Sequence, residues 1–281
     1  MAPALGDPAA VVYSVAPGRV DELAGELLDD VEGDVLVALG GGRVIDTAKA
    51  LAAAREPGSR PRVVAIPTTL SAAEMTAVHR RAVGADAALP GVRPAVVVND
   101  PGLSASQPVV ALAASAANAL AHAAEGPATT RASPVPTMAG REAARLIGAA
   151  YASGEDPDRD ALALAALLSG YAIDANGYGL HHVLSQTLVR IAGIAHGQAN
   201  AALLPHTLAA LDGRGAPHAG ALVDLATDLA RRAQATRLRD LGVTEEQLEA
   251  CADGAAGRPE LDLTPPRADH TELRALYAAA Y

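Results

Sequence analysis

The sequence predicts an α/β half with a doubly wound, mostly parallel sheet, followed by an all-helical half. Short Val-rich runs bounded by glycine, proline or aspartate occur up to residue 100, and Ala- and Leu-rich text of helical character fills the rest. We therefore expect an α/β domain over residues 1–103 and an all-helical domain over residues 104–281.

Four runs are expected to form the strands of the sheet. They are short and rich in β-branched residues, which is typical of strands buried in a parallel sheet. Helical stretches at 19–28 and 44–54 lie between them, so strands and helices alternate as in βαβ units. The expected strands are 10–15, 34–39, 62–67 and 94–100.

The second half reads as a series of helices. Pro108 suits the first turn of a helix that runs to residue 124. Pro205 lies inside the candidate helix 198–211 and predicts a kink or a late start. The segment 254–269 is rich in proline and charge and is expected to be a surface loop. The other candidate helices are 138–151, 158–176, 179–191, 219–241, 244–253 and 270–280.

Composition excludes several classes of function. Hydrophobic residues make up 50% of the chain and charged residues 19%, which is typical of a folded protein. With 2% aromatics, a net charge of −10 and no basic tract, nucleic acid and anionic membrane surfaces are not expected partners. Cys251 is the only cysteine, which excludes an internal disulfide. The N-terminus does not resemble a signal peptide and no apolar run could span a membrane, so we expect a cytoplasmic protein.

A run of three glycines is the sharpest local signal. Gly40, Gly41 and Gly42 separate an expected strand from an expected helix. Backbone N–H groups can approach an anion closely there, and the helix start adds the positive end of its dipole, so the turn suits a pyrophosphate. A tight turn without a ligand fits the same sequence. Asp46 and Lys49 follow at helical spacing, and Lys49 is the only lysine of the chain. These two residues could belong to a binding site, or they could lie on a solvent-exposed helix face.

Hydroxyl side chains follow the strand expected at 62–67. They belong to Thr68, Thr69 and Ser71. In open α/β sheets, ligands bind at the carboxyl ends of the strands, so these hydroxyls are candidates for ligand binding.

Five of the eight histidines lie between residues 122 and 206. Asn118 and His122 share a face of one expected helix, His182 opens another, and His196 follows 14 residues later. Converging imidazoles could hold a divalent cation, polarise a substrate carbonyl or transfer protons. Taken singly, each could equally be a core or capping histidine.

Together these segments resemble the iron-containing alcohol dehydrogenase superfamily, and most closely its maleylacetate-reductase-like branch. They occur in the family's order over roughly residues 10–210. The segments are GGGRVIDTAKA (40–50), IPTTLSAAEMT (66–76), NDP (99–101), NALAHAAEG (118–126) and GLHHVLSQTLVRIAGIAHGQANAALLPH (179–206).

The resemblance implies an active site in a cleft between a nucleotide-binding domain and a helical domain, with NAD or NADP as cofactor. By position, it assigns cofactor binding to Gly40, Gly41, Gly42, Asp46, Thr68, Thr69 and Ser71. It assigns catalysis to His122, His182 and His196, and these three with Asn118 occupy the positions that hold Fe²⁺ or Zn²⁺ in metal-dependent members.

The chain departs from the family pattern at three points. Asn118 stands where metal-dependent members carry a carboxylate. Members of the maleylacetate-reductase-like branch, which resemble metal-free enzymes, also carry an asparagine at this position. Gln186 stands where the family often has a further histidine. The first nucleotide-binding strand and an edge hairpin are expected to be missing before residue 10.

The resemblance implies an NAD(P)-dependent oxidoreductase most like maleylacetate reductase, which transfers a hydride to a small unsaturated oxo-acid in aromatic degradation. A metal-dependent alcohol dehydrogenase that acts on a small alcohol or aldehyde is the alternative, and an inactive truncated homologue is another. A lyase like dehydroquinate synthase is disfavoured, because only one lysine and no basic cluster accompany the histidines. The expected partners are a small-molecule substrate and, by resemblance, a second subunit in a homodimer.

Overall fold

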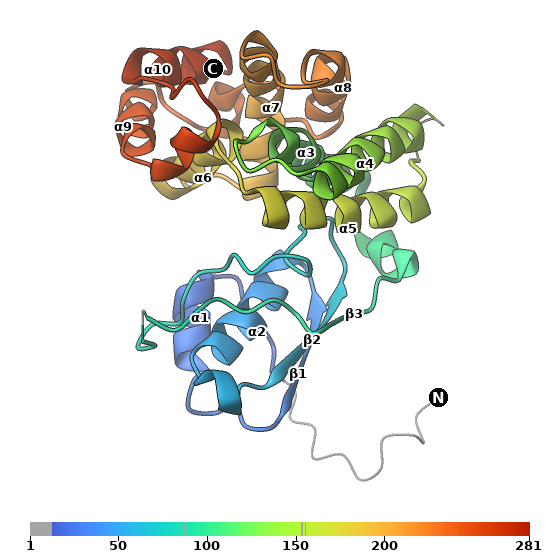
Figure 1. Ribbon diagram of the computed structural model, residues 1–281, viewed down its shortest axis with the longest axis vertical. Helices are drawn as coiled ribbons and strands as arrows, with labels where there is room; N and C mark the ends of the chain where they lie inside the picture. The colour runs from blue at the N-terminus through green and yellow to red at the C-terminus, as the bar shows by residue number, and fades with distance from the viewer. Residues whose placement is uncertain (1–12, 87, 153, 155) are drawn as a thin grey trace.

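The computed structural model describes residues 13–86, 88–152, 154 and 156–281, and its strands all lie in the first half of the chain. They form one parallel sheet in the order β1-β2-β3, and within the described residues only helices follow β3. Figure 1 shows the sheet with α1 and α2 at one end of the molecule and the later helices at the other. The strands are β1 (Val35–Gly40), β2 (Arg62–Pro67) and β3 (Val96–Val97).

The predicted fold class is confirmed. Helices α1 (Val20–Glu26) and α2 (Gly42–Ala53) pack on each other, and α2 also packs against β1 and β2. Because side chains alternate along a strand, the residues of β1 that point away from α2 form the opposite face, and Val35, Val37 and Leu39 are exposed there. Within the described part of the chain, α2 therefore packs on one face of β1 and β2, and the opposite face of β1 is exposed. The division into two domains at residue 103 stays a prediction.

The register between β1 and β2 positions the site. Gly40 pairs with Pro67, so the two strands end side by side, and the N–H of Thr68 donates to the carbonyl oxygen of Gly40 at 3.0 Å. The glycine turn and the loop after β2 therefore start from neighbouring points at the carboxyl edge of the sheet, as the sequence predicts.

Lys49 holds the loop after β2 against α2. Its side chain is fully buried, and Nζ donates to Asp46 Oδ1 at 2.8 Å and to the carbonyl oxygens of Ala73 and Val78 at 2.9 Å each. These contacts use all three donors of the ammonium group. The only lysine of the chain thus anchors a loop through hydrogen bonds. It is neither an unpaired cation nor part of a solvent-exposed helix face.

Glu74 lies in the same loop and is buried without a hydrogen bond. Neither carboxyl oxygen has a partner among the described residues, and the side chain is 1% exposed. Burial raises the pKa of Glu74 to about 7, although Lys49 nearby acts against this rise. The loop therefore contains a carboxyl group that is costly to ionise.

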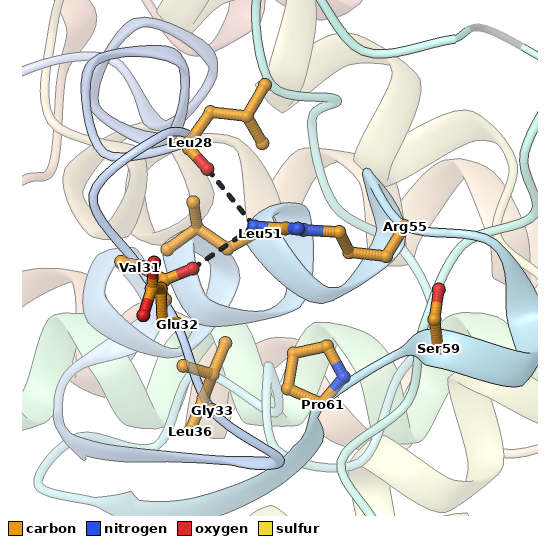
Figure 2. Close-up of a pocket in the computed structure, with 9 residues that line it drawn as sticks. All are labelled: Leu28, Val31, Glu32, Gly33, Leu36, Leu51, Arg55, Ser59 and Pro61. Atoms are coloured by element: carbon orange, nitrogen blue, oxygen red, sulfur yellow. Dashed lines mark hydrogen bonds between the residues drawn. The ribbon is translucent and has the colours of Figure 1, made fainter.

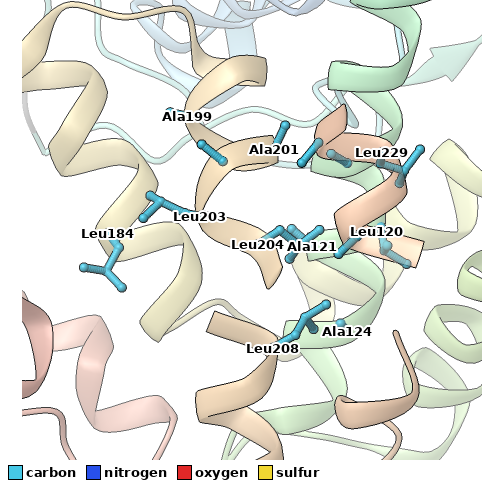
Figure 3. Packing of buried hydrophobic residues seen from close by; sticks show 14 of the residues in the cluster. Leu120, Ala121, Ala124, Leu184, Ala199, Ala201, Leu203, Leu204, Leu208 and Leu229 are labelled. Atoms are coloured by element: carbon cyan, nitrogen blue, oxygen red, sulfur yellow. The ribbon is translucent and has the colours of Figure 1, made fainter. Parts of the chain in front are cut away.

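The helical half is built around α3 (Val109–Glu125), which is buried almost throughout from Leu112 onward and packs against α4, α5, α6, α7 and α8. Figure 3 shows alanines and leucines of α3 and α7 packed together, as expected for a chain without Phe or Trp. No described helix is long and apolar enough to cross a membrane. The other helices are α4 (Pro134–Ala152), α5 (Arg159–Asn176), α6 (Leu180–Ala192), α7 (His196–Gly213), α8 (Val223–Arg232), α9 (Glu245–Ala256) and α10 (His270–Ala279). Short 3₁₀ helices are η1 (Pro57–Ser59), η2 (Pro101–Ser106), η3 (Gly126–Ala128), η4 (Gly220–Leu222), η5 (Leu238–Leu241) and η6 (Pro259–Leu263).

Two of the expected strands differ from the structure. Residues 10–12 of the strand expected at 10–15 lie outside the described residues, and residues 13–15 form no strand. There the Tyr13 hydroxyl donates to the carbonyl oxygen of Asp30 at 2.6 Å, which holds the segment over a loop instead. The strand expected at 94–100 shortens to β3: Pro94 has no N–H to donate, and Asp100 accepts from the N–H of Gly102 at the start of η2 instead of continuing the strand.

Two expectations for the second half are also wrong, and one of the two effects expected of Pro205 is excluded. The helix expected at 219–241 breaks after α8, where Gln234 takes a left-handed backbone conformation with φ of 52°. The segment 254–269 is no surface loop: α9 extends into it, η6 follows, and Thr264 is buried as an acceptor for the N–H of Leu180 at 3.1 Å. Helix α7 starts early, at His196, and continues through Pro205, so the late start is refuted.

Two glycines of α4 differ in the space that their surroundings leave for a side chain, and one of them faces α3. A Cβ at Gly140 would lie 2.7 Å from the carbonyl oxygen of Ala123, whereas a Cβ at Gly148 meets Leu225 Cδ2 at 3.6 Å. We expect Gly140→Ala to lower the free energy of unfolding by about 1–3 kcal/mol through overpacking. Gly148→Ala, the matched control, should raise it by up to about 1 kcal/mol through helix propensity. Urea unfolding measures both, and equal effects of the two variants would refute the close approach.

The buried carboxyl of Glu74 predicts a pH-dependent stability. Its pKa in the folded state lies above its ordinary value of 4.5, so the folded state holds the extra proton between pH 4.5 and about 7. Stability therefore falls as pH rises through this window. Glu74→Gln cannot ionise and should be more stable than the parent at pH 8, by up to about 3 kcal/mol, and similar at pH 4.5. Urea unfolding at both pH values tests this, with Glu142→Gln on the exposed side of α4 as control.

Candidate active site

The glycine turn and the loop after β2 touch each other. A Cβ at Gly41 would lie 3.0 Å from Thr69 Cγ2, and a Cβ at Gly42 would lie 2.9 Å from Ser71 Cβ. The approach therefore depends on glycine at both positions. The structure thus brings together the predicted cofactor-binding residues of the turn and of the loop, although their role in binding stays a prediction.

The loop is attached to α3 next to the predicted catalytic residues. The N–H of Leu70 donates to Ser115 Oγ at 2.9 Å. Ser115, Asn118 and His122 are spaced by three and four residues, so they share one face of α3. At a rise of 1.5 Å per residue, His122 lies about 10 Å along the helix axis from Ser115. The glycine turn and the imidazole are therefore linked through one loop and one helix face.

Two of the predicted histidines form a stacked pair. The rings of His122 on α3 and His182 on α6 are 4.7 Å apart between centroids, with 11° between their planes. Both residues are buried. Burial lowers the pKa of His182 to about 3 and that of His122 well below its ordinary value, and each ring is further disfavoured as a cation by neighbouring histidines. Both imidazoles are therefore neutral near pH 7.

His196 begins α7 beside the same helix. A Cβ at the next residue, Gly197, would lie 3.2 Å from Ala114 Cβ, so the start of α7 lies directly on α3. The His196 residue as a whole is exposed, yet enough protein atoms surround its ring to lower its pKa. It is close enough to lower the pKa of His122 and His182 electrostatically. The predicted histidines thus lie in one region.

The donor atoms of this region do not form a closed site for a divalent cation. Asn118 Oδ1, His122 Nδ1 and His182 Nε2 are buried without a hydrogen-bond partner among the described residues. They include no carboxylate, and a neutral amide is a poorer ligand for a hard dication. Across the described chain, only one cluster brings the ligand atoms of three His, Cys, Asp or Glu side chains within 4.8 Å of one another. It consists of Glu249, Asp253 and His270 on α9 and α10, and it is mostly exposed. We therefore derive no step through a metal, and the predicted metal role of Asn118 and the histidines stays a prediction.

Glu125 is a central residue of the site that the sequence analysis did not single out. It ends α3, is fully buried, and its Oε1 accepts from the backbone N–H of His181 at 2.6 Å. Its Oε2 lies 2.5 Å from Nδ1 of His182. Burial raises the pKa of Glu125, and the N–H groups at the start of α6 act against this rise. Its place one turn after His122 was the available signal.

Gln186, the departure from the family's usual histidine, is held by an arginine from the far end of the chain. Arg258 donates to Gln186 Oε1 at 3.1 Å and pairs with Glu260 at 2.8 Å. The ring of Tyr178, whose hydroxyl joins this network, lies 5.8 Å from that of His182. Arg258 falls in the segment expected to be a surface loop, which is why its part in this network was missed.

A cavity of about 220 Å³ lies at the opposite end of β1 (Figure 2). No histidine lines it, and its Arg55 already donates to the carbonyl oxygens of Leu28 and Val31. It lies beside Gly33, just before β1, and Leu36, at the start of β1, whereas the predicted cofactor residues lie at the end of the strand and after it. This cavity is therefore not the candidate active site.

Comparisons with known proteins agree with this arrangement. The family model for iron-containing alcohol dehydrogenase matches residues 17–101, and that for the C-terminal part of the Fe-containing alcohol dehydrogenase family matches residues 112–216. The chain is 32% identical to a maleylacetate reductase of Pseudomonas aeruginosa, over 94% of this chain and 79% of that protein. It is also 32% identical to a maleylacetate reductase of Rhizobium sp. strain MTP-10005, over 100% of this chain and 84% of that protein.

The solved structures lead to the same family. The maleylacetate reductase of Agrobacterium tumefaciens superposes with a TM-score of 0.79 at 28% identity, over 92% of this chain and 78% of that one. A 1,3-propanediol oxidoreductase superposes with a TM-score of 0.81 at 25% identity, over 97% and 84%. The chain therefore belongs to the iron-containing alcohol dehydrogenase family of oxidoreductases, in its maleylacetate-reductase-like branch.

Proposed function

We propose that this chain reduces a small unsaturated oxo-acid with NADH or NADPH, as the maleylacetate reductases that it resembles are named for doing. The observation that carries the proposal is the buried, neutral pair of His122 and His182, linked through α3 and Leu70 to the glycine turn. On the same resemblance we propose a homodimer and a cytoplasmic location.

The glycine turn is suited to hold the pyrophosphate of the dinucleotide. Gly41 precedes the 12-residue helix α2, and no side chain caps the helix start. The first N–H groups of a helix lack intrahelical partners and attract anions. Thr68, Thr69 and Ser71 lie beside this turn and would add hydroxyl donors, so a dinucleotide bound here would extend its nicotinamide towards α3.

The histidine pair can handle the proton that the reaction requires. When bound, the nicotinamide supplies a hydride to one carbon of a carbon–carbon double bond, and a proton must then reach the neighbouring carbon. Nε2 of His182 is buried and free of hydrogen bonds among the described residues, so it can take up a proton from water and pass it to that carbon. Glu125 beside Nδ1 would stabilise the imidazolium formed meanwhile. His196, which is exposed, is a candidate to contact the substrate's carboxylate.

A metal-dependent alcohol dehydrogenase remains the second candidate, on one observation. Asn118 Oδ1 and one nitrogen on each of His122 and His182 are left without partners, as the ligands of an ion would be. Elemental analysis of the purified protein, with NADH oxidation assayed against maleylacetate and against simple aldehydes, separates the two. Bound iron or zinc together with aldehyde reduction would favour the second candidate.

Removal of His182 tests the proposed function. We expect His182→Ala to lower kcat for NADH-dependent reduction of maleylacetate by at least about 100-fold, because the proton carrier is lost. NADH binding, followed by fluorescence, and the circular dichroism spectrum should stay unchanged. His218→Ala, a histidine of the turn between α7 and α8, serves as the control and should retain full activity. Full turnover by His182→Ala would contradict the proposed function.

A further inference from the structure

The carboxylate of Glu125 caps a helix to which it does not belong. Helix α6 follows Gly179, which offers no side-chain cap, so its first N–H groups need partners from elsewhere. Glu125, at the end of α3, accepts from the N–H of His181 at 2.6 Å and from that of His182 at 3.3 Å. One carboxylate therefore joins the end of α3 to the start of α6.

The same carboxylate restricts where the His182 ring carries its proton. Backbone N–H groups can only donate, so both oxygens of Glu125 already act as acceptors. Acceptance by both oxygens is the hydrogen-bond pattern of an ionised carboxylate, which has no proton to give. The contact of 2.5 Å between Oε2 and Nδ1 of His182 then requires the hydrogen to be on Nδ1.

We propose that Glu125 is a positioning residue that fixes the neutral imidazole of His182 in the tautomer protonated at Nδ1. The lone pair of the ring is thereby placed on Nε2, the atom without a hydrogen-bond partner among the described residues. Tautomer selection by the partner of the other ring nitrogen is a general property of histidine. The tautomer itself does not depend on the proposed function; only its effect on turnover does.

The neighbouring histidine provides an internal control, because its contacts select the opposite tautomer. Nε2 of His181 lies 2.8 Å from Asn200 Oδ1, and Asn200 Nδ2 donates to the carbonyl oxygen of His196 at 2.8 Å. The amide oxygen can only accept, so the His181 hydrogen is on Nε2. Nδ1 of His181 then accepts from the hydroxyl of Thr207 at 2.8 Å.

The variant Glu125→Gln should reverse the His182 tautomer while keeping the fold. The amide oxygen of the glutamine would stay at the short bond to the His181 N–H, which leaves the amide NH₂ facing Nδ1 of His182. Since NH₂ can only donate, Nδ1 must become the acceptor, and the ring proton moves to Nε2. The lone pair of Nε2 is then lost.

Imidazole ¹⁵N spectra of protein with labelled histidine test this. In the parent we expect His182 protonated at Nδ1 and His181 at Nε2, with assignments from His181→Gln and His182→Gln. In Glu125→Gln, His182 should switch to Nε2 and His181 should not. Reductase turnover should fall at least about 100-fold, as an orienting carboxylate contributes in other His–carboxylate pairs, with NADH binding changed less than twofold. Glu142→Gln, on the surface of α4, should change nothing.

The proposal is overturned if His182 of the parent is protonated at Nε2, or if Glu125→Gln leaves His182 protonated at Nδ1. If the variant does not fold, the spectrum of the parent alone decides. A parent with His182 protonated at Nδ1 but no reductase activity would support this inference and contradict the proposed function.

Discussion

The site depends on a stripe of polar residues along a buried helix. Ser115, Asn118, His122 and Glu125 recur every three or four positions and so lie on one face of α3. Buried polar groups cost free energy unless they are hydrogen-bonded. The two ends of the stripe are bonded, to the loop after β2 and to the start of α6. In its middle, Asn118 Oδ1 and His122 Nδ1 lack hydrogen-bond partners in the described chain.

Small side chains make this arrangement possible. Because the core of the helical half is built of alanine and leucine, backbones approach closely, as at Gly197 on Ala114. Groups on separate helices then come within hydrogen-bond range, such as Glu125 on α3 and the N–H of His181 on α6. Bulkier residues at these contacts would separate the helices and with them the imidazoles, so the composition of the core is part of the site.

Local features of the sequence were sufficient for the fold class and part of the site. The spacing of Asn118 and His122 places them on one helix face, and β1 and β2 follow from Val-rich runs with clear ends. Contacts between distant segments leave no such trace. Gln186 and Arg258, for example, are 72 residues apart in the sequence and form a hydrogen bond. Lys49, the only lysine, suggests a functional site by its rarity, whereas in the structure it anchors a loop. Which atom of His182 faces Glu125 also depends on side-chain direction, which periodicity does not specify.

The charge balance of the site gives Asn118 a physical reason. Glu125 already places one carboxyl group among neutral imidazoles, and its negative charge is met by N–H donors of α6 rather than by an arginine or lysine. A second carboxylate at position 118, on the same face of α3, would add a buried charge that only a cation could compensate. With an amide there, the site needs no such cation. The single proton that His182 can take up then matches the single charge of Glu125.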